Sequence, residues 1–373
     1  TINIVFMPYF KFHNIKITGV ATSIPSHVVK TDDRTDVWGK EYIEKFKAAV
    51  GIEQIHTTAE HQTASDLCYD AAERLILHKN IKREEIGAVL FVGFSTDYWR
   101  PSNACILQYR LGLSQDCVAY DLRLACSATP YGLQAACSMM QTSDIKKVLL
   151  LIGEMSSQST YQGDSTALLF GDAGSAILLE KTEEENFIEE MLCSDGSGFK
   201  AIIVPAGGFR NPDATHEVFT LANGSKNTLY NTWLNGADVF AFSISAVPKT
   251  TKAFFEKTGS KVDDYDCFPI HQANKAICLK IAKKLGIPLE RMPLVIDKYG
   301  NTTATSLILA LCDTYGKDNS NVELNCLIQA FGIGLSWGVA SARINTNDIL
   351  PITETDNIFT EGIVNTPADI GIV

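Results

Sequence analysis

Residues 121–137 read DLRLACSATPYGLQAAC, and this stretch decides how the chain is interpreted. An apolar, strand-like run ends at Cys126, small residues follow, and the next segment has the pattern of a helix. A thiol at the start of a helix lies near the positive end of the helix dipole, which favours the nucleophilic thiolate. Free cysteine is also among the most buried residue types, so this stretch alone favours a small core residue. The rest of the chain has to decide between these interpretations.

The composition is that of an ordinary globular protein. The chain has 373 residues, 46% of them hydrophobic and 20% charged, which is enough for a large core and two domains. A net charge of −11 argues against nucleic-acid binding, and no apolar run reaches the ~18 residues of a membrane span. The ten cysteines form no CxxC pair, which favours reduced thiols over disulfides or a zinc site. We therefore expect a cytoplasmic protein without a secretory signal.

Apolar strand-like runs alternate with amphipathic stretches, which is the pattern of an α/β protein. Strands are expected at 15–25, 86–96, 117–125 and 146–155, and helices at 63–80, 102–113 and directly after Cys126. Residues 165–181 read as a hairpin around a glycine–aspartate turn, with Asp164 and Asp172 as turn residues.

The second half of the chain repeats the order of the first in outline. The segment VDDYDCFPIHQAN has the shape of REEIGAVLFVGFSTD, and NCLIQAFGIGLSWGVASARI resembles the strand and glycine turn of the first half. Such an echo indicates a duplicated α/β unit. We expect an N-terminal half at 1–182, a C-terminal half at 183–345 and an irregular tail at 346–373, with an acidic connection near 180–190.

Polar residues stand at the ends of three apolar runs. Cys126 is the first, His271 in FPIHQANKA is the second, and Asn301 in DKYGNTTATSLILAL is the third. Taken singly, the histidine would be a core residue and the asparagine a helix cap. Together they form a chemical set, because a thiol can accept an acyl group, and an imidazole and an amide can stabilise a developing oxyanion. This chemistry requires neither a carboxylate nor a metal.

Four motifs carry a resemblance to a known family. The segments ACSATPYGLQAA, HQANKAI, YGNTTATS and AFGIGLSWGVA occur in family order, and the likeness runs from about residue 14 to residue 344. The sequence resembles the β-ketoacyl-acyl-carrier-protein synthase III enzymes of the thiolase superfamily. The resemblance implies a five-layered α-β-α-β-α fold built from a duplicated half, and a homodimer.

The resemblance also implies a reaction and the residues that perform it. Cys126 would be acylated by a thioester of acyl carrier protein or coenzyme A, and a malonyl thioester would be decarboxylated to an enolate that attacks the acyl group. His271 and Asn301 would stabilise the enolate, and the backbone amides of Cys126 and Ile333 would hold the acyl oxyanion. No metal or other cofactor is implied, and the setting would be fatty-acid or polyketide biosynthesis.

Two departures from the family concern coenzyme A. The family's tryptophan and arginine in a W…RTGI stretch clamp the adenine, whereas YIEKFKAAVGIEQ has Ala49 and Val50 before its glycine. The arginine that follows HQAN in the family is also missing, since Lys275 and Ala276 stand there. We therefore favour a substrate delivered on a carrier protein, in a specialised pathway rather than housekeeping initiation.

A third departure concerns the acyl group. The family has an apolar side chain before a Pro-Ser pair, where it reaches into the acyl pocket of the partner subunit, whereas this chain has Trp99 and Arg100. A buried cation needs a partner, so the acyl group would be short, polar or acidic, unless Arg100 points to solvent. Acyl carrier proteins are acidic, so a docking site for one should be basic. The helix after His271 carries four lysines that form either such a docking site or an ordinary solvated helix face: Lys275, Lys280, Lys283 and Lys284.

Two alternatives stay open at this point. The acyl-cysteine could pass its acyl group to an alcohol or an amine, in which case His271 would be a general base. The chain could also be a silent partner subunit of an active condensing enzyme. The usual sign of a silent subunit is the loss of the nucleophile, and Cys126 is present.

Overall fold

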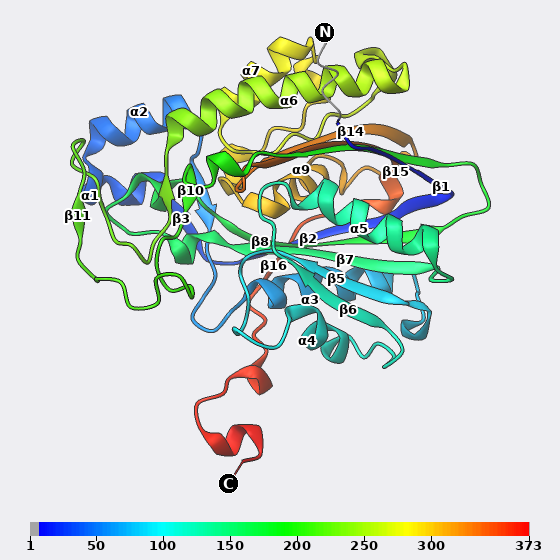
Figure 1. Ribbon diagram of the computed structural model, residues 1–373, viewed down its shortest axis with the longest axis horizontal. Coiled ribbons are helices and arrows are strands. Elements are labelled where there is room, and N and C mark those ends of the chain that lie inside the picture. The colour runs from blue at the N-terminus through cyan, green and yellow to red at the C-terminus, as the bar shows by residue number, and fades with distance from the viewer. Residues whose placement is uncertain (1–6, 373) are drawn as a thin grey trace.

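The computed structural model describes residues 7–372, and a six-stranded sheet forms one half of it (Figure 1). Its strand order is β16-β2-β8-β7-β5-β6. The strands β7, β5 and β6 run parallel, with β6 at the edge, while β8 is antiparallel to both β2 and β7. Every residue of β5 is buried, as expected for a strand covered on both faces. The strands are β2 (Ile15–Pro25), β5 (Ala88–Val92), β6 (Val118–Leu122), β7 (Lys147–Met155), β8 (Asp172–Lys181) and β16 (Thr353–Thr355).

A four-stranded antiparallel sheet forms the second half, in the order β1-β9-β15-β14. The long hairpin of β14 and β15 turns at residues 333–335, within the glycine-rich motif of the sequence. The strands are β1 (Tyr9–His13), β9 (Phe187–Ser194), β14 (Glu323–Gly332) and β15 (Ser336–Asn345).

Helices cover both sheets and also fill the space between them. α3 and α4 share a buried cluster with the outer face of the six-stranded sheet, and α6 and α7 do the same for the four-stranded sheet. α5 and α9 lie between the sheets, so the chain has the five layers α-β-α-β-α (Figure 1). The expected thiolase-type layering is confirmed. The helices are α3 (Ala64–His78), α4 (Asn103–Arg110), α5 (Ala128–Thr142), α6 (Gly236–Thr258), α7 (Lys275–Leu285) and α9 (Ser306–Tyr315).

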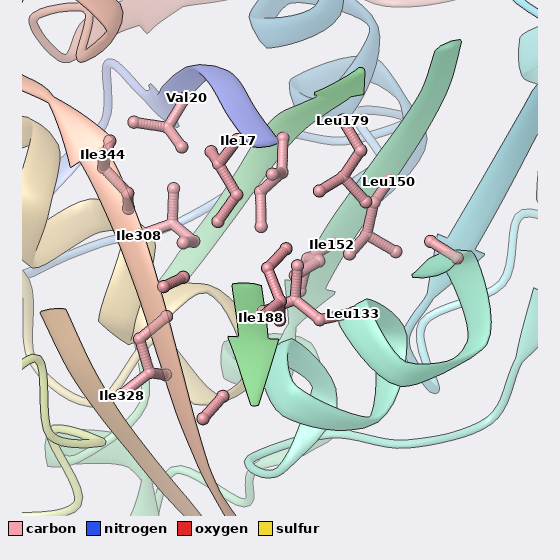
Figure 2. Close-up of a cluster of buried hydrophobic side chains, with 14 of the residues drawn as sticks. Ile17, Val20, Leu133, Leu150, Ile152, Leu179, Ile188, Ile308, Ile328 and Ile344 are labelled. Carbon is pink, nitrogen blue, oxygen red and sulfur yellow. The ribbon is translucent and has the colours of Figure 1, made fainter. Parts of the chain in front are cut away.

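The central layer is held by branched aliphatic side chains from both sheets. Each large aliphatic side chain that is buried stabilises the fold by about 1.5–3 kcal/mol, so the packing of this cluster holds the two halves together. Figure 2 shows its members converging from the strands of both sheets and from the two central helices: Ile17, Val20, Leu133, Leu150, Ile152, Leu179, Ile188, Ile308, Ile328 and Ile344.

Smaller elements surround the far end of the two sheets. Two helices lie between the paired strands β3 and β4, and two short strand pairings, β10 with β13 and β11 with β12, lie in the long connection between β9 and α6. These elements are α1 (Thr35–Trp38), α2 (Lys40–Val50), α8 (Ile296–Tyr299), β3 (Val28–Lys30), β4 (Gln54–His56), β10 (Ile202–Ile203), β11 (Phe219–Thr220), β12 (Lys226–Asn227) and β13 (Trp233–Leu234).

Most of the elements expected from the sequence are present, but the hairpin at 165–181 is wrong. Residues Ser165–Leu168 form a 3₁₀ turn, and Asp172 begins the single strand β8. Asp164 does cap the turn through the Thr166 amide, as a turn residue should. Asp172 is instead fully buried, and it accepts bonds from the backbone N–H and hydroxyl groups of both Thr58 and Ser157. The glycine–aspartate pair signals a turn locally, but tertiary hydrogen bonds make it a strand start.

The segment after β15 is not wholly irregular. Residues Thr353–Thr355 form β16, which pairs in parallel with β2 and extends the six-stranded sheet. None of the helices in residues 7–372 is both long and apolar enough to cross a membrane.

Candidate active site

Cys126 lies between the end of β6 and the start of α5, and it is only 4% exposed. Gly332, at the end of β14, lies directly against it. A Cβ built on Gly332 would be 2.4 Å from the Cys126 Cβ and 2.8 Å from its Sγ, so only glycine fits. The next residue, Ile333, hydrogen-bonds the thiol through its backbone amide. The glycine turn therefore brings an amide donor to the sulfur, where the sequence predicted an oxyanion site.

His271 follows a segment that makes two isolated parallel bridges to β14, Cys267 with Cys326 and Ile270 with Gln329, rather than a continuous strand. Its backbone N–H donates to the Gln329 carbonyl at 2.9 Å. The imidazole Nδ1 lies 2.8 Å from the Ser306 hydroxyl, and the ring packs edge-on against Phe331 with 5.2 Å between centroids. The side chain is 1% exposed. These contacts fix the ring, and no side chain within residues 7–372 is hydrogen-bonded to Nε2.

The other polar residues of the HQAN motif hold the loop that carries His271. The Gln272 side-chain amide donates to the carbonyls of Ile270 and Pro293, and its oxygen accepts from the Val295 amide. The Asn274 side chain caps α7 by accepting from the Ile277 amide at 2.8 Å. The motif thus supplies one reactive group and two supports.

Asn301 is 4% exposed and is oriented by the chain that follows it. Its Oδ1 accepts from the Thr303 amide at 2.9 Å, so the amide nitrogen has to face the other way. That nitrogen donates to the Ala273 carbonyl at 3.5 Å, a long bond that leaves donor capacity for a substrate. Thr303 has φ +48°, a left-handed conformation that is unusual for a β-branched residue and is typical of functional sites.

The three predicted groups are connected through the C-terminal end of β14 and the segment 301–306. Neighbouring residues of β14 contact different members, since the Phe331 ring touches His271 and Gly332 touches Cys126. Ser306 binds His271, and Thr303 binds Asn301. Groups far apart in the sequence are therefore linked through the end of β14 and the segment 301–306.

Burial decides the charge state of the centre. It raises the pKa of the Cys126 thiol to about 12, against the opposing effect of the Ile333 and Cys126 amides. It also lowers the pKa of His271 to about 3, while a hydrogen bond with the Thr303 backbone acts in the other direction. Both groups are therefore neutral at pH 7. Desolvation of the thiol therefore outweighs the effect of the helix dipole on its pKa.

Glu154 is a buried acid near this centre that the sequence analysis missed. It is the penultimate residue of β7, within the apolar run VLLLIGEM, and is 2% exposed. Its carboxylate accepts from the Phe94 amide at 2.7 Å and from the Ser95 hydroxyl at 2.6 Å. Burial raises the pKa of Glu154 to about 7. The acid ties the loop after β5 to β7, and a charged residue inside a buried strand was the signal that could have revealed it.

The other predicted residues lie at the surface. Trp99 is 74% exposed and packs against Phe209, and Arg100 beside it is exposed. Within one chain neither side chain reaches the three central groups, and their role in the acyl pocket of a partner subunit stays a prediction. All four predicted docking lysines are exposed on α7: Lys275, Lys280, Lys283 and Lys284.

Two cavities open elsewhere on the described residues. One of about 680 Å³ lies between Trp38 and Tyr42 on one side and the 160–163 and 223–226 segments on the other. The second, of about 260 Å³, lies between Asp97 and the 362–365 segment. Neither is lined by Cys126, His271 or Asn301. Within residues 7–372, no cluster of three or more His, Cys, Asp and Glu side chains could hold a metal ion.

Comparison with known proteins agrees with this geometry. Residues 120–196 match the family 3-oxoacyl-[acyl-carrier-protein (ACP)] synthase III, and residues 255–344 match the C-terminal region of the same enzymes. A provisionally named 3-oxoacyl-[acyl-carrier-protein] synthase 3 of Campylobacter jejuni is 34% identical over 349 residues, covering 91% of this chain and 96% of its own. The β-ketoacyl-[acyl-carrier-protein] synthase III of Latilactobacillus sakei is 31% identical over 333 residues, covering 88% and 99%.

A solved structure shows the same fold over almost the whole chain. The 3-oxoacyl-(acyl-carrier protein) synthase of Burkholderia xenovorans LB400 superposes with a TM-score of 0.88 at 30% identity, covering 94% of this chain and 99% of its own. Fold and site together define a condensing acyltransferase of the thiolase superfamily. Within that class, the chain belongs to the 3-oxoacyl-[acyl-carrier-protein] synthase III family.

Proposed function

We propose that the protein catalyses a decarboxylative Claisen condensation between an acyl group on Cys126 and a malonyl thioester. Two observations support the proposal: Cys126 and His271 contact the adjacent residues Gly332 and Phe331 of β14, and Asn301 donates to the Ala273 carbonyl in the loop that carries His271. The Cys126 sulfur attacks the donor thioester, the carrier thiolate leaves, and the thiol proton ends on that leaving group. The malonyl thioester then loses carbon dioxide, and its enolate carbon displaces the Cys126 thiolate from the acyl group.

The first half-reaction needs donors at the developing oxyanion. The backbone amides of Cys126 and Ile333 both hydrogen-bond the sulfur region, so an acyl oxygen formed there meets fixed dipoles. Removal of one such donor typically costs about 3 kcal/mol of transition-state stabilisation, because the donor needs no reorganisation. These amides belong to the helix start and the glycine turn, whose positions are set by close packing.

The second half-reaction needs donors at the enolate oxygen. Asn301 supplies its Nδ2 hydrogen, and His271 supplies Nε2 if the Ser306 hydroxyl donates to Nδ1. Ser306 also lies 3.0 Å from the Thr303 carbonyl, and it has only one hydrogen to give. The orientation of that single hydroxyl therefore selects which nitrogen of His271 carries the proton.

The same hydroxyl supports a second candidate function. If Ser306 donates to Thr303, His271 carries its hydrogen on Nδ1 and offers Nε2 as a base. A neutral base beside an acyl-cysteine fits acyl transfer to an alcohol or an amine. Release of carbon dioxide from a malonyl thioester separates the two, since only the condensation produces it.

We propose an acyl carrier protein rather than coenzyme A as the source of the thioesters. The residues of the family's adenine clamp are replaced by Ala49 and Val50, while the four lysines of α7 are exposed. None of the four has an ion-pair partner within residues 7–372. The double variant Lys280→Glu/Lys283→Glu should raise KM for a carrier-bound substrate at low salt, and Lys317→Glu should not. Equal KM values for both variants would contradict docking on α7.

We also propose a homodimer that joins through β6. This strand is the open edge of the six-stranded sheet, and its first residue, Val118, is 41% exposed. Open edge strands pair with further strands unless they are blocked, and β6 carries no proline or lysine that would block it. A second copy would also place Trp99 and Arg100 next to the acyl pocket of its neighbour, and we propose a short, polar or acidic acyl group for that pocket.

Intact-mass measurement after incubation with a panel of acyl thioesters tests the proposed function. The wild-type chain should gain the mass of one acyl group, and Cys126→Ala should gain none. A wild-type chain that acquires no acyl group from any donor would indicate a silent partner subunit instead. An adduct that persists in Cys126→Ala would show that another residue is the nucleophile.

A further inference from the structure

The described chain ends in an arm, residues 356–372, that extends beyond the region shared with the family (Figure 1). The family match ends at residue 344, so the arm lies outside the matched residues. Its first part is fixed to the body at Phe359, whose ring covers the Arg110 guanidinium at 4.5 Å and whose amide donates to Asp66 at 3.0 Å. The Tyr98 hydroxyl donates to the carbonyl of Gly362.

Beyond these anchors the arm makes hydrogen bonds only with itself. Within the described residues, Asp369 accepts from the amides of Asn365 and Thr366, and Gly371 closes the short turn Pro367–Ile370 in a left-handed conformation. This turn is well capped but isolated, and Figure 1 shows it standing away from the body. A single turn buries too little surface to offset the entropy of its ordering, so it needs a surface to lie on.

The exposed apolar side chains of the arm indicate that the surface it lies on is apolar. Val364 is 44%, Ile370 57% and Ile372 65% exposed in the single chain. The arm has acidic residues but no lysine or arginine from residue 344 onward. Its complement would therefore be an apolar face with free positive charge. An isolated exposed side chain needs no explanation, but three on one short arm indicate a contact.

The face beside the open edge of β6 has these properties. Tyr109 on α4 is 61% exposed and Val118 on β6 is 41% exposed. Arg123, just after β6, is exposed, contacts the Phe94 ring and has no ion-pair partner within the described residues. The arm leaves its own body next to this face, because the Tyr109 hydroxyl donates to Glu361 at 3.1 Å.

Symmetry then brings the arm of one chain to this face on another. A two-fold axis at paired β6 strands places the two α4 helices on the same side, where each faces the other chain. The ten residues after Gly362 can span up to about 33 Å when extended, which exceeds the ~10 Å between packed helices. We infer that residues 356–372 form a dimer arm that lies on a second copy of this chain, against α4 beside the paired β6 strands; the inference rests on the proposed homodimer.

Truncation after Gly362 tests the arm without removing its anchors. Sedimentation velocity over a dilution series should show a dimer dissociation constant at least tenfold higher for the truncated chain than for the full chain. The double variant Ile370→Asp/Ile372→Asp should behave like the truncation. The matched control Leu77→Asp, at a 70% exposed position near the far end of α3, should dissociate like the wild type.

The outcomes separate this inference from the homodimer itself. A full chain that is monomeric throughout the series contradicts the homodimer and the arm together. A dimer that dissociates at the same concentration with and without residues 363–373 leaves the homodimer intact and overturns the arm. A photo-reactive side chain at position 370 in mixed ¹⁴N/¹⁵N dimers should crosslink to α4 or β6 of the other chain, and crosslinks confined to its own chain would overturn the inference.

Discussion

The reaction centre and the middle of β9 both bury titratable groups in their uncharged form, but they differ in the hydrogen-bond partners of these groups. Cys126 is hydrogen-bonded to the Ile333 amide, and His271 is hydrogen-bonded to the Ser306 hydroxyl. Glu190 on β9 is fully buried, and neither of its carboxyl oxygens has a hydrogen-bond partner within the described residues. Burial alone therefore does not mark a functional group. In the reaction centre, the functional groups are distinguished by hydrogen bonds that direct a proton to or from them.

Replacement of His271 should give the largest effect, because it removes a group from the reaction itself. In His271→Ala, release of carbon dioxide from a malonyl thioester should fall about 10²–10³-fold, the usual loss for one oxyanion donor. Acylation of Cys126, measured by intact mass, should survive because its donors are backbone amides. The exposed His216, which stacks on Tyr230, provides the matched control His216→Ala. Loss of acylation with unchanged carbon dioxide release would assign His271 to the first half-reaction instead.

Replacement of Glu190 should have the opposite sign, since it removes a cost without touching the reaction. Glu190→Leu should raise the free energy of unfolding by about 1–3 kcal/mol, the range for an unpaired buried polar group. Burial holds the pKa of Glu190 well above its usual value, so the folded chain keeps a proton that the unfolded chain loses above about pH 4.5. The stability of the wild type should therefore fall as pH rises from 5 to 8, relative to Glu190→Leu.

The isosteric variant Glu190→Gln separates the two parts of that effect. It keeps an unpaired polar group but cannot ionise. Its free energy of unfolding should therefore stay below that of Glu190→Leu by an amount that does not change with pH. Urea unfolding at pH 5 and pH 8 measures both parts. A Glu190→Leu variant that is less stable than the wild type at both pH values would mean that the carboxyl group has a stabilising role.

Ser306 offers the smallest and most specific change. Ser306→Ala removes the partner of His271 Nδ1, and loss of one hydrogen bond should lower kcat for condensation about tenfold with little change in KM. Ser306→Thr keeps the hydroxyl and should restore most of the rate. Because burial lowers the pKa of His271 to about 3, neither variant should introduce a rate change between pH 5 and 8 from protonation of this residue. A wild-type kcat in Ser306→Ala would show that the hydroxyl does not direct the imidazole.

The sequence alone carried the architecture and the reactive groups. The α/β class follows from apolar periodicity, which is a local signal, as the fully buried run of β5 illustrates, whereas the five layers were implied by the resemblance to the synthase III family. Cys126, His271 and Asn301 stood out because a polar residue at the end of an apolar run is visible without the fold. The division at residues 182 and 345 remains a prediction, although the two sheets draw their strands largely from either side of residue 182.

What escaped the sequence depends on contacts between distant segments. The hydroxyl of Ser306 matters only because α9 starts beside His271, and Asp172 begins a strand because Thr58 and Ser157 bind it. The neutral thiol was also unforeseen, since the helix dipole acts locally whereas desolvation of Cys126 comes from the packing of both halves. The arm was expected to be merely irregular, and its anchors come from α3, α4 and the loop after β5.

Single-turnover release of carbon dioxide from chains that already carry an acyl group on Cys126 tests the proposed roles of the thiol and the amide most directly. A malonyl thioester labelled at its free carboxyl is added to acylated wild type and to acylated Asn301→Ala. The wild type should release one labelled carbon dioxide per acyl group, and Asn301→Ala should do so at least 100-fold more slowly, because the enolate loses a donor. Equal rates in the two chains would show that the amide does not face the same substrate as the thiol.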